Sequence, residues 1–147
     1  MNALKLIAAF ALLGTSASLA APGDQIDPKE YKDSVSLLLG TQGTIQFKQE
    51  GDKVTRATLV QDPDQKLQGI RVEFKKQPEF LALMLKNSLP NALRYRAAIR
   101  LKGRKGYFET SLIVPVMAGL LSYETWQDPI EELILFEFKL TDEKLKQ

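Results

Sequence analysis

The residues best suited to chemistry are six cations between positions 94 and 105, with no acidic residue among them. They are Arg94, Arg96, Arg100, Lys102, Arg104 and Lys105. The first four alternate with apolar residues as on a β-strand, so they share one face, and the last two follow in a glycine-containing turn. Because each guanidinium offers a planar, bidentate fork, this pattern predicts a site for phosphate or carboxylate groups. An anionic envelope lipid, an acidic glycan or the chain terminus of a partner protein would fit.

The same pattern has a structural interpretation. Glu109, Glu131 or Glu137 could lie opposite the arginines and form cross-strand ion pairs. Basic residues on edge strands also prevent aggregation. Because surface charge usually serves solubility, the sequence favours this interpretation over a ligand site and leaves both open.

The absence of histidine and cysteine excludes most catalytic chemistry. Neither an imidazole base nor a thiolate nucleophile is available, so a Ser-His-Asp triad is impossible. Zinc sites nearly always need His or Cys. A Ser–Lys dyad, a carboxylate pair or an all-oxygen metal site remains. We therefore expect no enzyme and no cofactor, and we keep a small Ser–Lys or carboxylate hydrolase as a third hypothesis.

The acidic residues offer little support for that third hypothesis. Glu131 and Glu132 are adjacent on a predicted strand, so we expect them to point to opposite faces. The segments 50–52 and 62–64 each carry two acids that could supply calcium oxygens, but neither approaches the ligand count of a calcium loop. Both are better interpreted as turns.

Period-two alternation predicts the elements that position these residues. Strands are expected at 44–48, 54–61, 70–75, 80–87, 92–101, 107–114 and 130–140. On the strand 92–101, the face opposite the arginines carries Leu93, Tyr95, Ala97, Ile99 and Leu101. Seven short strands bounded by turn residues predict a mainly β fold, an antiparallel β-sandwich.

One stretch has a more specific architectural meaning. From Phe80 to Ile99, a strand and a turn are followed by the sequence LRYRAAI, which resembles the central strand pair of immunoglobulin-like domains. The cysteine pair that marks true immunoglobulin domains is absent. The resemblance implies an immunoglobulin-like sandwich.

Two segments could be either helix or strand. Residues 27–30 (DPKE) have the form of a helix start, and Tyr31, Val35, Leu38 and Leu39 share a helical face. We expect a short N-terminal helix here, with a strand at 35–39 as the alternative. The segment 78–89 could be a proline-started helix, but a buried strand is preferred. In the irregular stretch before residue 128, we expect Trp126 to plug the core, and we expect 114–121 to be a buried crossover.

The N-terminus predicts export. A basic start, the apolar run 6–13 and small residues at Ser18 and Ala20 have the order of a cleavable signal peptide. The expected organisation is a signal peptide at 1–20, a polar N-terminal arm at 21–33 and a single β-sandwich domain at 34–147. The expected location is the periplasm or the medium, with no membrane span after cleavage.

These observations favour a non-catalytic binding domain of the bacterial envelope, and the basic strand face makes an anionic ligand a candidate. The alternative is a structural or assembly partner that pairs with another envelope protein through an edge strand or an apolar segment. The formal net charge of only +2 makes nucleic acid an unsuitable partner.

Overall fold

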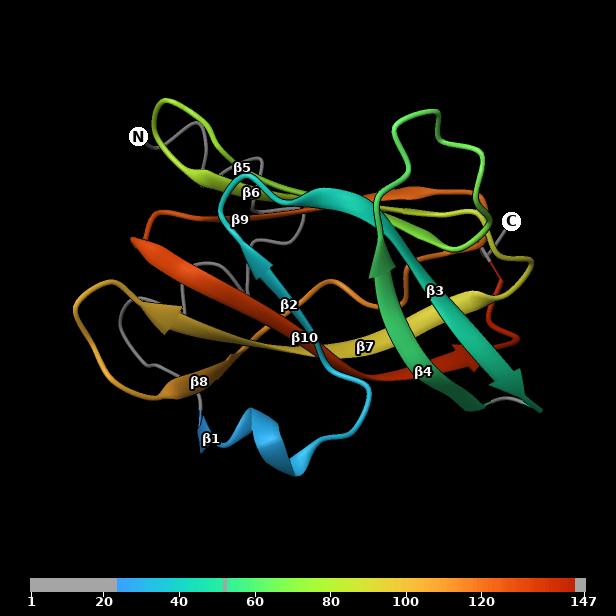
Figure 1. The fold of residues 1–147 in the computed structure, drawn as a ribbon, viewed down its shortest axis with the longest axis horizontal. Helices are drawn as coiled ribbons and strands as arrows, with labels where there is room; N and C mark the ends of the chain where they lie inside the picture. Colours follow the sequence, from blue (N-terminus) through green and yellow to red (C-terminus); the bar gives the residue numbers. More distant parts are fainter. Residues whose placement is uncertain (1–23, 52, 145–147) are drawn as a thin grey trace.

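The computed structural model describes residues 24–51 and 53–144, which form one sheet of antiparallel strands (Figure 1). The strand order is β1-β8-β7-β10-β4-β3-β5-β6-β9, and β2 also pairs with β10. The bounds are β1 Gln25–Ile26, β2 Val35–Leu38, β3 Gln42–Glu50, β4 Lys53–Val60, β5 Ile70–Lys76, β6 Leu81–Asn87, β7 Ala92–Leu101, β8 Tyr107–Thr110, β9 Leu121–Trp126 and β10 Ile130–Thr141. The expected signal peptide lies outside the described residues.

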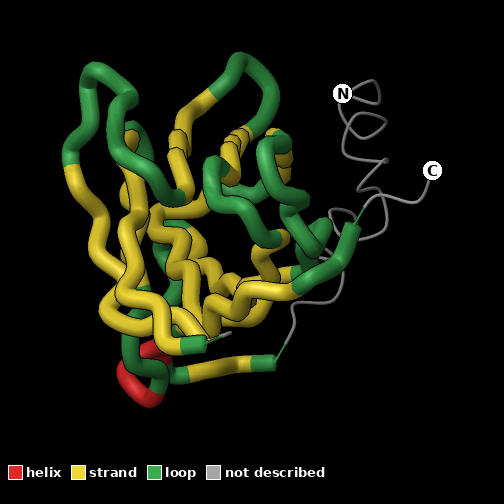
Figure 2. Tube along the Cα trace, turned by 90° about the vertical axis from the view of Figure 1, so that its right-hand side faces the viewer, coloured by secondary structure: helices red, strands yellow, loops and turns green. Residues whose placement is uncertain are grey.

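The sheet folds over at the long β3–β4 hairpin into two facing layers (Figures 1 and 2). One layer contains β8, β7, β10, β2 and β4, and the other contains β3, β5, β6 and β9. A mainly antiparallel β fold, consistent with a sandwich, is therefore confirmed. No helix in the described part of the chain is long and apolar enough to cross a membrane.

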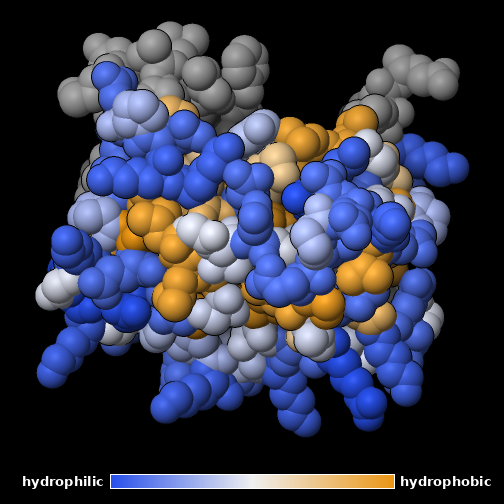
Figure 3. All heavy atoms as spheres, turned by 45° about the horizontal axis from the view of Figure 1, so that its top comes forward, coloured by the Kyte–Doolittle hydropathy of each residue, from blue (hydrophilic) through white to orange (hydrophobic). Residues whose placement is uncertain are grey.

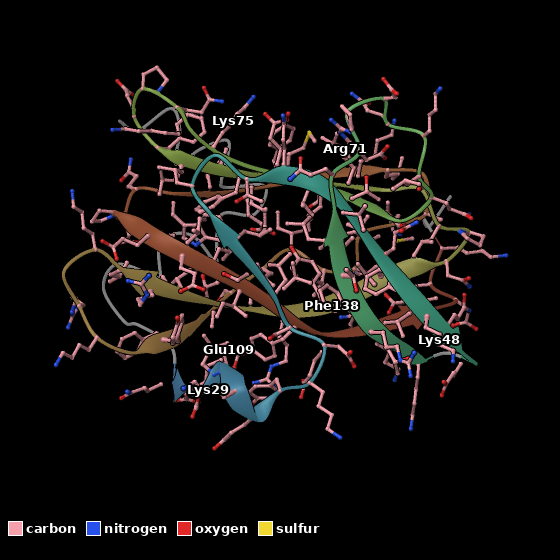
Figure 4. All side chains as sticks on the ribbon, viewed as in Figure 1. Lys29, Lys48, Arg71, Lys75, Glu109 and Phe138 are labelled. Carbon is pink, nitrogen blue, oxygen red and sulfur yellow. The ribbon has the colours of Figure 1, made fainter. Side chains whose placement is uncertain are left out.

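The core lies between the two layers. Phe74 of β5 and Leu83 of β6 are fully buried against Leu133 and Leu135 of β10, and Phe138 also points into this space (Figure 4). Burial of each such side chain contributes about 1.5–3 kcal/mol. Strand β7 has the predicted facing, with its odd-numbered residues toward the core and its arginines outward.

The predicted N-terminal helix is wrong. Only Pro28–Glu30 form a helical turn, a 3-10 turn (η1) in which the Asp27 carboxylate accepts from Lys29 N at 3.0 Å. The chain then forms β2, which pairs with β10 and buries Val35 and Leu37 on alternate positions. Leu38, which the helical pattern placed inside, is 56% exposed. Period two prevails here because pairing with β10 satisfies the backbone and buries both apolar side chains.

Two boundaries near the C-terminal half also differ from expectation. The predicted strand 107–114 ends at Thr110, and the chain rejoins β7 only where Val116 bridges Leu93. Pro115 lacks the N–H that a continuous ladder needs. The stretch expected to be irregular contains the strand β9. Burial of 114–121 is partial, because Val116 is buried whereas Leu121 is 47% exposed.

The N-terminal segment covers the outer face of the β8–β7–β10 layer. Strand β1 pairs with β8, and Tyr31 packs on Phe136 with ring centroids 4.4 Å apart. Ala98 and Ile134 complete this second, smaller apolar cluster. Residues 24–33, expected to be a polar arm, thus contribute both a strand and packing contacts.

Candidate functional site

The strand arginines, Arg94, Arg96 and Arg100, lie in a row on the outer face of β7. Their neighbours on this face come from β8 on one side and from β10 on the other. Both neighbouring strands supply glutamates. The three arginines therefore lie in a field of opposite charge rather than on an open basic surface.

Arg96 has the most complete set of partners. It binds Glu109 through two hydrogen bonds, from Nε at 2.7 Å and from Nη2 at 2.6 Å, and it binds Glu137 from Nη1 at 2.8 Å. Figure 4 shows Glu109 on the side of the sheet where η1 lies. The guanidinium also lies over the rings of Tyr31 and Phe136, 5.4 and 5.0 Å from their centroids. The hydrogen bonds that Arg96 donates to Glu109 and Glu137 raise the pKa of Arg96, and they lower the pKa of Glu109.

The other two strand arginines are paired as well. Arg94 binds Glu143 through Nε and Nη2, at 2.6 and 3.0 Å. Arg100 binds Glu131 through Nη1, and its Nε lies 3.4 Å from Glu132 Oε1.

The expectation that Glu131 and Glu132 point to opposite faces is wrong. A bulge between Ile130 and Glu132 breaks the alternation of β10, so both carboxylates reach the same guanidinium of Arg100. Glu132 accepts a further hydrogen bond from Tyr107 OH at 2.6 Å. This carboxylate pair is therefore committed to ion pairing.

These contacts confirm the cross-strand ion pairs expected with Glu109, Glu131 and Glu137. Guanidinium donors bonded to carboxylates are no longer available to a ligand without competition. The cations in the turn after β7 differ from the strand arginines.

We call Lys102, Arg104 and Lys105 the turn cations. They are exposed and form no ion pair within residues 24–51 and 53–144.

The turn that carries these cations is fixed by its backbone. Gly103 and Gly106 have φ values of 72° and 88°, a conformation that glycine adopts without strain. Arg104 N donates to Leu101 O at 3.1 Å, and Lys102 N donates to Pro129 O at 2.7 Å. The second bond attaches the end of β7 to the β9–β10 turn.

A cavity of about 560 Å³ lies at this end of the sandwich, and we call it the end cavity. It is open to solvent and is bordered by the β2–β3, β5–β6 and β9–β10 turns and by Lys102. Its apolar walls are Leu39, Pro78, Phe80, Leu81, Pro129 and Ile130, and its charged walls are Lys76, Glu79, Lys102, Asp128 and Glu131. On the face drawn in Figure 3, exposed apolar side chains form separate patches among hydrophilic ones. The end cavity thus brings one predicted site residue, Lys102, beside apolar surface.

The acidic segment at 62–64 organises a loop. The Asp62 carboxylate accepts from Thr44 Oγ1 at 2.9 Å and from the backbone N–H groups of Lys66 and Leu67, each at 3.0 Å. Burial tends to raise the pKa of Asp62, but these hydrogen bonds outweigh it and lower the pKa. Among the described residues, no group of three or more acidic side chains could hold a metal ion.

Sequence reasoning missed a buried acid on β9. Glu124 is 3% exposed, and burial raises its pKa to about 7. Its Oε2 accepts from Ile113 N at 2.5 Å. Trp126, two residues later on the same face, is buried as predicted and donates from Nε1 to Thr110 Oγ1 at 3.1 Å. Ser122, Glu124 and Trp126 occupy alternate positions, and this period of two was the signal that could have predicted the strand. Because Ser122 and Glu124 are polar, the pattern did not stand out as a buried face.

Two of the serine hydroxyls are engaged in hydrogen bonds. Ser36 Oγ is bonded to Glu132, and Ser88 Oγ is bonded to the backbone of Gly69.

Comparison of the sequence and structure with protein-family models, with curated proteins and with solved structures found no match.

Proposed function

We propose that this protein is an exported, non-catalytic binding protein of the bacterial envelope. We further propose an immunoglobulin-like arrangement of its sandwich and a location in the periplasm or outside the cell. Its ligand carries an anionic group, which the turn cations recognise, on an apolar body that the end cavity receives. The observation that carries this proposal is the contrast between the paired strand arginines and the turn cations, which form no ion pair with any described residue and of which Lys102 lines that cavity.

The shape and chemistry of the end cavity support an amphipathic ligand. Its volume of about 560 Å³ lies within the usual range for small-molecule sites. Phe80 and Pro129 offer apolar contact, whereas the amines of Lys76 and Lys102 offer charge. Of the acids on its wall, Glu131 is already bonded to Arg100. A phosphate or carboxylate held near Lys102 would also be close to the two cations that follow in the turn.

Dodecyl phosphate is a suitable ligand with which to test this function. Trp126 is the only tryptophan, and it precedes Gln127 on the cavity wall, so its fluorescence should follow binding. Dodecyl phosphate should bind saturably, and binding should weaken as salt rises from about 0.05 to about 0.3 M, because exposed charges are then screened. Lys102→Gln should reduce affinity several-fold, whereas Lys48→Gln on the distant β3–β4 hairpin should not. Equal binding by both variants, or binding of dodecanol with the same affinity, would reject the proposal.

A second candidate function, as an assembly partner, is favoured by strand β9. Among the described strands, β9 pairs with β6 alone and lies at the end of the strand order. Its outward residues Leu121 and Tyr123 are 47% and 50% exposed. Such an edge can accept a strand from another protein. Tyr123→Lys should then abolish a cross-linked envelope complex and leave dodecyl phosphate binding unchanged, and a complex that survives this substitution would exclude this edge.

A further inference from the structure

The loop 61–69, between β4 and β5, is fixed to the outer face of the β3–β5–β6 layer near both of its ends. Near its start, the Asp62 carboxylate accepts from Thr44 of β3 at 2.9 Å. At its end, Gly69 N donates to Ser88 Oγ and Ser88 Oγ donates to Gly69 O, each at 2.9 Å. Gly69 has a φ of 153°, and a Cβ there would lie 2.3 Å from a backbone oxygen of β3, so only glycine permits this approach. The loop is therefore held in one place over the sheet.

A small cavity, which we call the loop cavity, lies between this loop and the sheet. Its volume is about 80 Å³. The sheet contributes Arg71 and Lys86 to its wall, and the loop contributes Asp62, Gln65 and Leu67. Figure 4 shows Arg71 beside this loop. Because a water molecule takes up about 30 Å³ in the liquid, the loop cavity has room for a group about the size of two or three waters.

Two cations face each other across the loop cavity. Arg71 of β5 lies directly opposite Lys86 of β6 in the register of the two strands, and like charges in this position destabilise a strand pair. The Lys86 ammonium has no partner among the described residues. Arg71 forms no ion pair there, and its one hydrogen bond, from Nη1 to Asp62 O, is long at 3.4 Å. Arg71 thus lacks the glutamate that each of the strand arginines has.

The other polar groups on the wall already have partners. Both oxygens of the Asp62 carboxylate accept hydrogen bonds from the backbone of the loop, and one of them also accepts from Thr44. The Ser88 hydroxyl both donates to and accepts from Gly69. The charged groups with free hydrogen-bonding capacity are therefore the two cations, which are donors only. With two cations and one acid, the wall carries one positive charge in excess, which suits a ligand group with a single negative charge.

We propose that the loop cavity binds the carboxylate group of a small organic acid. Arg71 donates to both carboxylate oxygens in the planar, bidentate arrangement that a guanidinium favours, and Lys86 supplies the second positive charge. Leu67, which is 37% exposed at the rim, contacts the first carbons of the acid. This site is separate from the end cavity, whose nearest residue on β5 is Lys76, about 16 Å further along the strand. It therefore goes beyond the proposed function.

The test uses sodium propionate and the exported protein at about pH 7, where the acid is ionised, with binding followed by amide chemical shifts in NMR. The Leu67 and Arg71 amides should shift saturably. Arg71→Gln should abolish binding, and Arg71→Lys, which keeps the charge but loses the fork, should weaken it several-fold. Lys86→Gln should also weaken it several-fold. Lys48→Gln, which removes an exposed cation from β3, is the matched control and should bind like wild type.

Propionamide has the same shape as propionate without the charge and should not bind. Shifts that propionamide or sodium chloride reproduces at the same concentration would overturn the proposal, as would equal affinity in wild type and Arg71→Gln. Tighter binding of inorganic phosphate than of propionate would overturn the assignment to a carboxylate. If Arg71→Gln does not fold, Lys86→Gln decides, because the Lys86 side chain is exposed. Lys102→Gln should leave propionate binding unchanged, so failure here is distinguishable from failure at the end cavity.

Discussion

Replacing Glu124 with glutamine should flatten the pH dependence of the free energy of unfolding in the near-neutral range. The pKa of this carboxyl is about 7 in the folded protein, against an ordinary value of 4.5. Each pKa unit corresponds to about 1.4 kcal/mol, so the difference amounts to about 3 kcal/mol. The folded state binds the proton more tightly than the unfolded state. The contribution is therefore fully present below about pH 4.5 and is lost as the pH rises through about 7.

Urea unfolding followed by Trp126 fluorescence measures this effect at intervals from about pH 5 to about pH 8. The chain has no histidine, so no imidazole titrates in this range. Wild type should lose about 2–3 kcal/mol across the interval, whereas Glu124→Gln should stay nearly level and be the more stable protein at the alkaline end. Glu50→Gln controls for the change in net charge. If the free energy of unfolding depends on pH with the same slope in wild type and in Glu124→Gln, the pH dependence does not come from Glu124 and the reasoning is refuted.

Three further outcomes are expected. Arg96→Ala should lower the free energy of unfolding by about 1–3 kcal/mol in urea titrations, because it leaves Glu109 without its bidentate partner and removes the contact with Tyr31; an unchanged midpoint would contradict this. In thermal melts, Tyr95→Phe should leave stability unchanged or raise it by up to about 1 kcal/mol, because its hydroxyl has no partner in the described part of the chain; a marked loss would show that the hydroxyl is bonded. Intact-mass measurement of exported protein should find Ala21 as the first residue; a stable full-length species would contradict cleavage.

The sequence was sufficient to predict most strands, because their apolar residues alternate strictly. Strand β7 runs from Ala92 to Leu101, as predicted, and its two faces were correctly distinguished. The same criterion failed at β9. There the outward residues Leu121 and Tyr123 are apolar but exposed, and the inward residue Glu124 is charged, so the pattern is inverted. An edge strand with a buried acid cannot be recognised from hydrophobicity alone.

The error at the N-terminus has a different origin. The spacing of Tyr31, Val35 and Leu38 suits a helix, but these residues pack in different directions. Tyr31 packs on the outer face, Val35 enters the core and Leu38 remains exposed. These different directions arise because β2 pairs with β10. This long-range contact cannot be predicted from the local spacing of apolar residues.

The individual partners of the arginines were also beyond sequence reasoning. Opposite charges on neighbouring strands could be expected, but their pairing depends on the register of β10. Two irregularities in that register, between Ile130 and Glu132 and between Phe136 and Lys139, bring the glutamates to the outer face. A bulge shifts every subsequent side chain, so a strictly alternating strand predicts the wrong partners.

The most direct test of the proposed function compares two triple variants. One replaces the strand arginines, Arg94, Arg96 and Arg100, with glutamine, and the other replaces the turn cations, Lys102, Arg104 and Lys105, in the same way. The strand variant should lose roughly 0.5–1 kcal/mol of stability per broken pair and still bind dodecyl phosphate. The turn variant should melt like wild type and lose dodecyl phosphate binding. A folded strand variant that no longer binds, or a turn variant that binds with unchanged affinity, would contradict the account.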